Sequence, residues 1–474
     1  MSGRHWTQHY IDGAWRSPSS SADIAVLHSV TEEVIETAPA GTVADVEHAA
    51  EAASRALPGW MASSLEERAG MIYALADGIR ARVDELGPLI SAEVGMPIEG
   101  ARGYQVLRAA DILCSFPRTA LELTFEERIG HSLVVKEPVG VVGAIAPSNF
   151  PLLLSLNKVG AALSAGCTVV LKPPETTPGT LLHLAEVAHE VGLPPGVLNV
   201  VSGYGPVVGE ALATSPIVDM ISFTGSTGVG RRLLELGSQT IKRAHLELGG
   251  KSAALVLDDA DLSDSLEKVV GQAFINAGQI CFAWSRVVVP RDRVREAEEI
   301  LAGLMERFSL GDPLDTATTL GPLTTAAARD RVRRHVEHAV KQGARVVAGG
   351  SEAPAGLNHG YFVRPTVLGG VTPEMDVAQQ EVFGPVLSLL THVGDKDAVR
   401  IGNDSVFGLH GAVFSEDPDR AMSAARGLRT GAVDINGFKL GTEAPFGGFK
   451  QSGLGRELGR YGLEEYLEVK AIQT

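Results

Sequence analysis

Short apolar runs and amphipathic segments alternate along much of the chain. Between residues 139 and 257, near-continuous runs of Val, Ile and Leu predict buried strands, and the segments between them predict helices. The expected strands are 139–145, 168–171, 197–201, 220–223 and 253–257, and the expected helices are 155–165, 180–191, 207–213 and 228–237. This alternation is typical of a parallel sheet with helices on both faces. We therefore expect an α/β fold that binds ligands at the carboxyl ends of its strands.

A second alternating set extends from residue 287 to about residue 431 and predicts another α/β unit. Its expected strands are 287–289, 345–347, 362–367, 386–391 and 411–414, and its expected helices are 294–308, 326–342, 396–403 and 418–427. Nearer the N-terminus, Thr42 with Asp45 and Ser64 with Glu67 have the spacing of capping boxes and predict two helix starts. These helices have one apolar face, so packing explains them without any chemistry.

Two segments depart from the alternation. Residues 121–138 contain two strand-like runs around a charged stretch ending at Gly130, which predicts a β-hairpin. Residues 466–470 form a short strand-like run near the C-terminus, and we expect it to pair with the hairpin of a partner subunit. A plain surface hairpin is the alternative interpretation of residues 121–138.

Composition narrows the class of protein. The 474 residues include 57 acidic and 41 basic side chains, a net charge of −16, which argues against nucleic acid and anionic membranes as partners. The three cysteines, Cys114, Cys167 and Cys281, are sparse and far apart, as expected in a reducing compartment. The N-terminus has no signal-peptide core, and no apolar run reaches the length of a membrane-spanning helix. We expect a soluble, cytoplasmic protein of two or three domains.

The stretch from Glu247 to Cys281 holds the candidate chemistry. Glu247 precedes a glycine pair, and Cys281 follows a Gly-Gln-Ile sequence. A nucleophilic cysteine needs a partly open polar environment and a base near the reacting carbon. A buried structural cysteine and a surface glutamate would explain the same residues. Gly225 begins a G-x-x-G-x-G turn that is weak evidence for a pyrophosphate site, since a tight strand-to-helix turn needs the same glycines.

Three other motifs are excluded. Residues 250–252 resemble the end of a phosphate-binding P-loop, but that motif requires glycine where the chain has His245. The esterase elbow fails because Lys450 stands at its first glycine position. His335 and His338 have no third ligand nearby in the sequence, so we expect a solvated helix face and no metal site.

The flanking residues carry a family resemblance. The sequences ELGGK at 247–251 and GQ-x-C-x-A-x-x-R at 278–286 resemble the two signature boxes of the aldehyde dehydrogenase superfamily. Further family-like motifs are PSNFP at 147–151, KPPE at 172–175, FTGST at 223–227, EVFGP at 381–385 and PFGG at 445–448. These motifs follow the family order, and the resemblance covers nearly the whole chain.

The resemblance implies a fold and its division into parts. We expect an α/β protein with a Rossmann-like NAD-binding domain, an α/β catalytic domain, and a small β oligomerisation hairpin with a C-terminal arm. The expected boundaries are 1–119 and 138–248 for NAD binding, 249–450 for catalysis, and 120–137 with 451–474 for oligomerisation. Such a hairpin joins a neighbouring subunit, so the expected assembly is a homodimer or homotetramer.

The resemblance also implies NAD-dependent oxidation of an aldehyde through a thioester. Cys281 would be the nucleophile, Glu247 would activate water, and the Asn149 amide would stabilise the oxyanion. The expected cofactor-binding residues are Ile145, Lys172, Glu175, Gly205, Phe223, Gly225, Ser226, Val229, Leu248, Glu381 and Phe383. The expected substrate-pocket residues are Phe150, Leu154, Asn157, Ile280, Phe282 and Phe446, with Phe438 nearby. Glu175 at the ribose hydroxyls would favour NAD over NADP.

Departures from the family pattern affect substrate identity. Ser148 stands where the family often has tryptophan, Asn157 replaces an aromatic residue of the tunnel, and the loop 436–445 matches no subfamily. The apolar residues of the pocket predict a medium-chain aliphatic or aromatic aldehyde. Two alternatives are a CoA-acylating relative, disfavoured by Glu247, and a non-catalytic oligomeric binding protein, which we would expect to lack Cys281 or Asn149.

Overall fold

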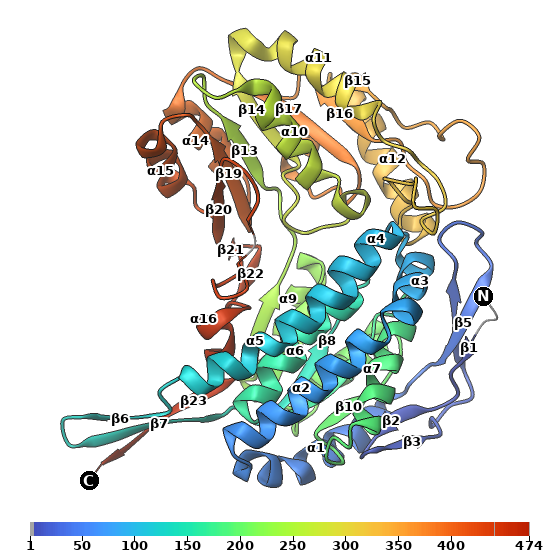
Figure 1. The fold of residues 1–474 in the computed structure, drawn as a ribbon, viewed down its shortest axis with the longest axis vertical. Helices are drawn as coiled ribbons and strands as arrows, with labels where there is room; N and C mark the ends of the chain where they lie inside the picture. Colours follow the sequence, from blue (N-terminus) through green and yellow to red (C-terminus); the bar gives the residue numbers. More distant parts are fainter. Residues whose placement is uncertain (1–3, 440, 474) are drawn as a thin grey trace.

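A sheet of eight strands forms the core of the first half of the molecule (Figure 1). The computed structural model describes residues 4–439 and 441–473. The strand order is β22-β12-β11-β8-β9-β10-β2-β3, and the five central strands from β12 to β10 are parallel. These are β8 (Val141–Ile145), β9 (Thr168–Lys172), β10 (Leu198–Val200), β11 (Met220–Thr224) and β12 (Arg243–Glu247). All residues of β8, β9 and β11 are buried, as expected for a parallel sheet covered on both faces.

Helices cover the two faces of this sheet and divide its core. Val142 and Ala144 of β8 belong to one apolar cluster, whereas Val141 and Ile145 belong to another, because side chains alternate along a strand. The first cluster includes residues of α2 (Leu65–Ala81), α5 (Arg108–Glu122), α6 (Pro151–Ala165) and α7 (Gly179–Glu190). The second includes residues of α1 (Val43–Ala62), α8 (Glu210–Thr214) and α9 (Thr227–Gly237). Both predicted capping boxes are present, at the starts of α1 and α2.

A second sheet of seven strands forms the other half, in the order β15-β16-β17-β14-β13-β19-β20. All its neighbouring strands are parallel except β15 with β16. Its strands are β13 (Ala253–Val256), β14 (Arg286–Pro290), β15 (Arg345–Ala348), β16 (Thr366–Gly369), β17 (Val386–His392), β19 (His410–Phe414) and β20 (Ala432–Ile435). The surrounding helices are α10 (Leu262–Ala273), α11 (Val294–Met305), α12 (Ala326–Lys341), α14 (Asp395–Asn403) and α15 (Pro418–Gly427). The predicted α/β fold with two alternating units is confirmed.

An arm of three strands extends from the body (Figure 1). It contains β6 (Glu126–Ile129), β7 (Ser132–Pro138) and β23 (Leu467–Gln473). β23 pairs along its whole length with β7 of its own chain, so the expectation that the tail pairs with a partner's hairpin is wrong. The reason is tertiary: α16 (Gly459–Glu464) packs on α5 and α6, and the Lys136 Nζ–Glu464 Oε1 ion pair of 2.7 Å holds the tail beside β7.

Local predictions failed at a few positions. The expected strand 362–367 begins only at Thr366, because Pro365 lacks a backbone N–H for ladder pairing. β12 was not predicted, since it contains Arg243 and His245 among its five residues. β22 (Gly453–Leu454) lies in the expected oligomerisation segment but pairs with β12 in the large sheet. The proposed domain boundaries stay a prediction.

The remaining elements are short or connect the main layers. They are β1 (Arg4–His5), β2 (His9–Ile11), β3 (Ala14–Arg16), β4 (Asp23–Leu27), β5 (Val34–Pro39), α3 (Val83–Val94), α4 (Ile98–Gly100), two π-helical segments (Ala101–Leu107 and Gly205–Gly209), three 3-10 helices (Ser238–Thr240, Ile275–Gly278 and Arg291–Arg293), α13 (Asp376–Gln379), β18 (Phe407–Gly408) and β21 (Phe449–Lys450). In the described part of the chain, no helix has both the length and the apolar character needed to cross a membrane.

Candidate active site

A tight turn delivers Cys281 to the space between the two sheets. After α10 the chain passes through Asn276 and Ala277, which have left-handed φ values of 50° and 53°. Gly278 follows with φ 72°, and a Cβ there would lie 2.2 Å from the backbone oxygen of Gly384. Only glycine fits this position, because both the backbone conformation and the close approach exclude a side chain. This close packing fixes the chain immediately before the cysteine.

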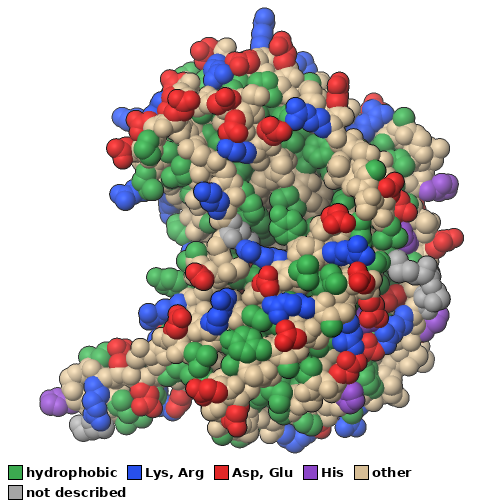
Figure 2. All heavy atoms as spheres, in the orientation of Figure 1, with side chains coloured by type: hydrophobic (Ala, Val, Ile, Leu, Met, Phe, Trp, Pro, Cys, Tyr) green, Lys and Arg blue, Asp and Glu red, His purple; other side chains and the backbone are tan. Residues whose placement is uncertain are grey.

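Two cavities meet at Cys281 and Asn149, which line both of them. We name the first the apolar cavity; it has a volume of about 650 Å³ and is lined by Glu99, Gly100, Gly103, Tyr104, Arg108, Asn149, Phe150, Leu153, Leu154, Ile275, Ile280, Cys281, Phe282, Phe438 and Phe446. We name the second the polar cleft; it has a volume of about 620 Å³ and follows the carboxyl ends of the large sheet. Figure 2 shows one face of the molecule, hollowed between its two halves, with hydrophobic side chains in the hollow.

Hydrogen bonds hold Asn149 in place just before α6. Its backbone oxygen accepts from Gln105 Nε2 and from Asn276 Nδ2, each at 3.0 Å. Its own Nδ2 donates to the backbone oxygen of Gln279 at 2.9 Å. A primary amide carries a second N–H donor, and it does not titrate. Asn149 is therefore a fixed, neutral donor beside Cys281.

Cys281 and Glu247 both lie in an environment that disfavours charge. Burial, followed by the nearby carboxylates of Glu247 and Glu381, raises the pKa of the Cys281 thiol well above its usual value. Burial and then Glu457 raise the pKa of Glu247, which ends β12 and is 2% exposed. Neither carboxyl oxygen of Glu247 has a hydrogen-bond partner among the described residues. Unpaired buried oxygens of this kind are suited to receive a proton from a bound molecule.

Asn157 does not line the apolar cavity, which corrects the expectation from sequence. Its Nδ2 donates to Glu457 Oε2 at 2.9 Å, and Lys158 Nζ lies 2.6 Å from Glu457 Oε1 and 2.6 Å from Thr224 Oγ1. Buried charges need such partners, so Glu457 holds Asn157 away from the pocket. The other five predicted pocket residues and Phe438 line the cavity. In the loop 436–445, Glu443 is exposed and does not line the cavity, and Leu440 is not among the described residues.

The polar cleft brings together all eleven residues predicted to bind the cofactor. At the end of β9, Lys172 Nζ lies 3.1 Å from Glu175 Oε2. Burial alone would raise the pKa of Glu175, but the Lys172 ammonium and hydrogen bonds from Lys172 and the backbone together lower that pKa, so Glu175 is a carboxylate. At the start of α9, the Ser226 side chain caps Val229 N, and a Cβ on Gly225 would lie 2.4 Å from the Phe223 ring. A helix start with a glycine turn is suited to phosphate groups.

Sequence reasoning missed residues that come from other elements. Arg331 of α12 lines the polar cleft, and its charge acts on Glu381, although nothing in its local sequence marks it. Glu99, Tyr104 and Arg108 line the apolar cavity from the helices around residue 100. Tyr104 is an exposed aromatic residue in the structure, and this exposure becomes visible only once the chain is folded.

Comparison with known proteins identifies the family. A model described as the aldehyde dehydrogenase family matches residues 15–472. The chain belongs to the aldehyde dehydrogenase family. The resemblance stated from the motifs is therefore confirmed, and so is the fold class.

Relatives of this family member cover nearly its whole length. A 3-succinoylsemialdehyde-pyridine dehydrogenase from a Pseudomonas species is 41% identical over 99% of this chain and 98% of its own. A cysteine-to-alanine variant of aldehyde dehydrogenase C from Pseudomonas syringae, solved with NAD+ and octanal, is 41% identical, with a TM-score of 0.97 over 98% of this chain and 96% of its own. An NAD+ complex of an aldehyde dehydrogenase from Bacillus cereus is 35% identical, with a TM-score of 0.95 over 98% of this chain and 96% of its own.

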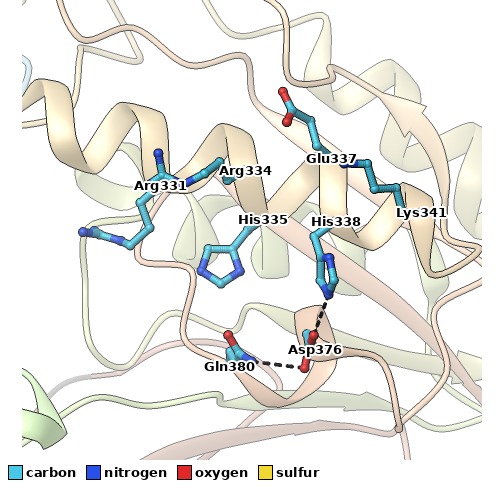
Figure 3. Close-up of a pocket in the computed structure, with 8 residues that line it drawn as sticks. All are labelled: Arg331, Arg334, His335, Glu337, His338, Lys341, Asp376 and Gln380. Carbon is cyan, nitrogen blue, oxygen red and sulfur yellow. Dashed lines mark hydrogen bonds and ion pairs between the residues drawn. The ribbon is translucent and has the colours of Figure 1, made fainter.

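A basic pocket lies beside the cleft on α12 (Figure 3). His338 Nε2 lies 2.7 Å from Asp376 Oδ2, and Gln380 Nε2 donates to Asp376 Oδ1 at 3.1 Å. His338 is therefore paired with a carboxylate and not with His335. Within residues 4–439 and 441–473, no group of three or more His, Cys, Asp or Glu side chains is placed to hold a metal ion.

Proposed function

We propose that this protein oxidises an aldehyde to a carboxylic acid with NAD+ as hydride acceptor. The observation that supports this most directly is the meeting of the apolar cavity and the polar cleft at Cys281 and Asn149. An aldehyde in the first cavity and a nicotinamide in the second would then share a single reactive cysteine. Bringing reactants together in this way accounts for much of enzymatic rate enhancement.

In the proposed first step, the Cys281 thiol gives its proton to solvent water, and Sγ forms a bond to the carbonyl carbon as the carbon–oxygen π bond breaks. The carbonyl oxygen becomes an alkoxide, which receives N–H donors from the Asn149 amide and the Cys281 backbone. Each such donor contributes roughly 3 kcal/mol to transition-state stabilisation. The raised pKa of Cys281 keeps the thiol protonated at rest. Attack of its sulfur on an aldehyde is therefore favoured only when the carbonyl oxygen of a bound aldehyde takes up the negative charge.

In the proposed second stage, collapse of the alkoxide releases the aldehyde hydrogen as hydride and leaves a thioester on Cys281. Bound NAD+ supplies the hydride acceptor. Glu247 then accepts a proton from water, the resulting hydroxide attacks the thioester, and the carbon–sulfur bond breaks to release the acid. Covalent catalysis thus separates oxidation from hydrolysis. Glu247 fits the role of base because its carboxyl oxygens are buried and accept no hydrogen bond from the described residues.

The residues of the polar cleft fit NAD rather than NADP. Glu175 offers a carboxylate to the ribose hydroxyls, and the same charge would repel a 2′-phosphate. The α9 start would take the pyrophosphate, and Glu381 and Phe383 would hold the nicotinamide ribose and ring. Solved relatives from Pseudomonas syringae and Bacillus cereus contain NAD+, which supports this choice.

The proposed substrate is a medium-chain aliphatic or aromatic aldehyde. Phe150, Phe282, Phe438 and Phe446 line the cavity, and each methylene removed from water there contributes about 0.8 kcal/mol until space runs out. The Pseudomonas syringae relative was solved with octanal, which is consistent with this size.

We also infer a homodimer or homotetramer. The arm exposes apolar side chains, with Ile129 58% and Val469 67% exposed, and β6 and β23 are its two unpaired edges. Edges of this kind are favourable sites for pairing with a second copy.

The test measures turnover of straight-chain aldehydes from acetaldehyde to decanal, of benzaldehyde and of betaine aldehyde. Each aldehyde is assayed with NAD, with NADP and with NAD plus CoA, and absorbance of the reduced cofactor reports the rate. Cys281→Ala should abolish turnover while leaving the fold and NAD binding intact. Cys114→Ala, at a half-buried cysteine outside both cavities, is the matched control and should retain activity. Normal oxidation by Cys281→Ala would contradict the mechanism, and formation of acyl-CoA would indicate the acylating reaction instead.

A further inference from the structure

Behind the apolar cavity lies a largely buried polar group that the proposed mechanism does not use. It consists of Trp284, His410 and Asp434, which we name the wall triad. Trp284 is 0% exposed and lies three residues after the nucleophile, whereas His410 begins β19 and is 4% exposed. Asp434 lies on the neighbouring strand β20. The fold brings together side chains that are far apart in the sequence.

One hydrogen bond and one close polar contact orient the His410 ring. Trp284 Nε1 donates to His410 Nδ1 at 3.0 Å, and because an indole N–H is only a donor, Nδ1 carries the lone pair. The imidazole hydrogen therefore resides on Nε2, which lies 3.4 Å from Asp434 Oδ2. Burial lowers the pKa of His410 to about 4, so the ring is neutral. The ring is held between a donor and an acceptor, and its orientation is set.

The His410 ring in turn supports the wall of the apolar cavity. Its centroid lies 5.6 Å from that of Phe282 and 6.3 Å from that of Phe438. Phe282 and Phe438 stack nearly parallel at 5.6 Å, and Phe446 meets Phe282 edge-on at 5.5 Å. All three phenylalanines line the cavity, whereas none of the wall triad does. Aromatic contacts at these distances prefer defined geometries, so the triad constrains the rings.

The backbone carrying Phe438 is also tied to the triad. Asp434 Oδ1 accepts a hydrogen bond from Lys439 N at 3.4 Å, directly after Phe438. At the root of the same loop, Asn436 has a left-handed φ of 57° and exchanges two hydrogen bonds with Ser415, at 2.9 and 3.0 Å. Asp434 thus contacts both the His410 ring and the backbone of the loop that carries Phe438.

Gln272 of α10 secures the other side of the wall. Its Nε2 donates to the backbone oxygen of Phe282 at 2.8 Å, and its Oε1 accepts from the backbone nitrogen of Trp284 at 2.6 Å. Phe282 is therefore held through its backbone by Gln272 and through its ring by His410.

We propose that Trp284, His410 and Asp434 are positioning residues that set the width of the apolar cavity and so determine selectivity for long or aromatic aldehydes over acetaldehyde. The inference rests on the proposed aldehyde oxidation. Acetaldehyde has only a methyl group beyond its carbonyl carbon, so it depends little on the distant wall. Octanal and benzaldehyde fill the cavity and depend on the positions of the phenylalanine rings.

The test is His410→Phe, which keeps an apolar ring but removes the hydrogen bond from Trp284 and the polar contact with Asp434. We expect KM for octanal and benzaldehyde to rise about tenfold, while kcat and the kinetics with acetaldehyde change by less than about twofold. Trp284→Phe removes the donor of the hydrogen bond between Trp284 Nε1 and His410 Nδ1. The double variant should therefore lose little more than either single variant, because interacting residues are non-additive.

His392→Phe is the matched control, since His392 is a buried histidine of the same sheet, on β17, that lies 2.9 Å from Val256 O and lines neither cavity. If His410→Phe raised KM equally for all aldehydes, or if its KM values across the aldehydes matched those of His392→Phe, the wall proposal would be overturned. No turnover of any aldehyde by the unmodified protein would instead contradict the proposed function. Calorimetry of octanal binding to Cys281→Ala, with and without His410→Phe, tests the wall independently: about tenfold weaker binding supports it, and unchanged binding overturns it.

Discussion

Replacing Asn149 with alanine separates its proposed role in catalysis from its role in folding. The side chain donates one hydrogen bond to Gln279 O, so its loss should lower the free energy of unfolding by about 1–3 kcal/mol, because a buried carbonyl loses its donor. The bonds from Gln105 and Asn276 go to the Asn149 backbone oxygen and survive the change. The local turn should therefore remain.

The catalytic effect should be larger than the structural one. Loss of one oxyanion donor corresponds to about 3–4 kcal/mol, a decrease in kcat of roughly 10²- to 10³-fold, with NAD binding unchanged. Asn149→Asp keeps the volume but places an acceptor against the developing alkoxide, and should be impaired at least as much.

Steady-state kinetics, with thermal unfolding in parallel, measures both quantities. The matched control is Asn199→Ala, a buried asparagine whose Nδ2 donates to Val169 O and Gly196 O away from the cavities. This control should lose stability but retain kcat. If Asn149→Ala kept kcat within about threefold of the unmodified protein, the oxyanion role would be refuted, since that corresponds to less than about 1 kcal/mol.

Three further predictions concern the cofactor, pH and assembly. The unmodified protein should have a higher kcat/KM with NAD than with NADP. Glu175→Ser should lower the ratio of these two kcat/KM values about tenfold, because it removes the negative charge that repels a 2′-phosphate. A preference of the unmodified protein for NADP would contradict this prediction. Burial lowers the pKa of His9, His245 and His410 from 6.5 to about 4. Between these values the unfolded chain binds more protons at these histidines, so their contribution to stability should fall as pH falls from 6.5 towards 4. The raised pKa values of Glu381 (about 7) and Asp434 (about 6) act in the opposite direction. Urea unfolding should therefore show a shallower fall in stability for His245→Phe than for the unmodified protein, and identical pH profiles would exclude the effect. Light scattering at micromolar concentration should show a dimer or tetramer, and a stable monomer would contradict the inferred assembly.

Some expectations failed because the deciding interactions are distant in the sequence. Asn157 has the right position on α6 for a pocket residue, yet its partner Glu457 lies 300 residues away and holds it elsewhere. The polar residues of β12 interrupt the apolar pattern from which a buried strand is predicted. Its assignment as a strand follows only from its pairing with β11 and β22 in the sheet. The tail strand was assigned to a partner's hairpin, because sequence shows an edge that needs pairing but not which chain supplies it.

The sequence by itself determined the features that depend on near neighbours. Capping boxes at Thr42 and Ser64 set helix starts, apolar runs set the parallel strands, and the motifs around Glu247 and Cys281 identified the family, because each signal lies within a few residues. Only the tertiary structure decided how two cavities meet at Cys281, which helix supplies Arg331, and how Trp284 and His410, 126 positions apart, hold the wall of one cavity. Contacts of this kind form when strands distant in the chain become neighbours in a sheet, and no local pattern of side chains encodes that pairing.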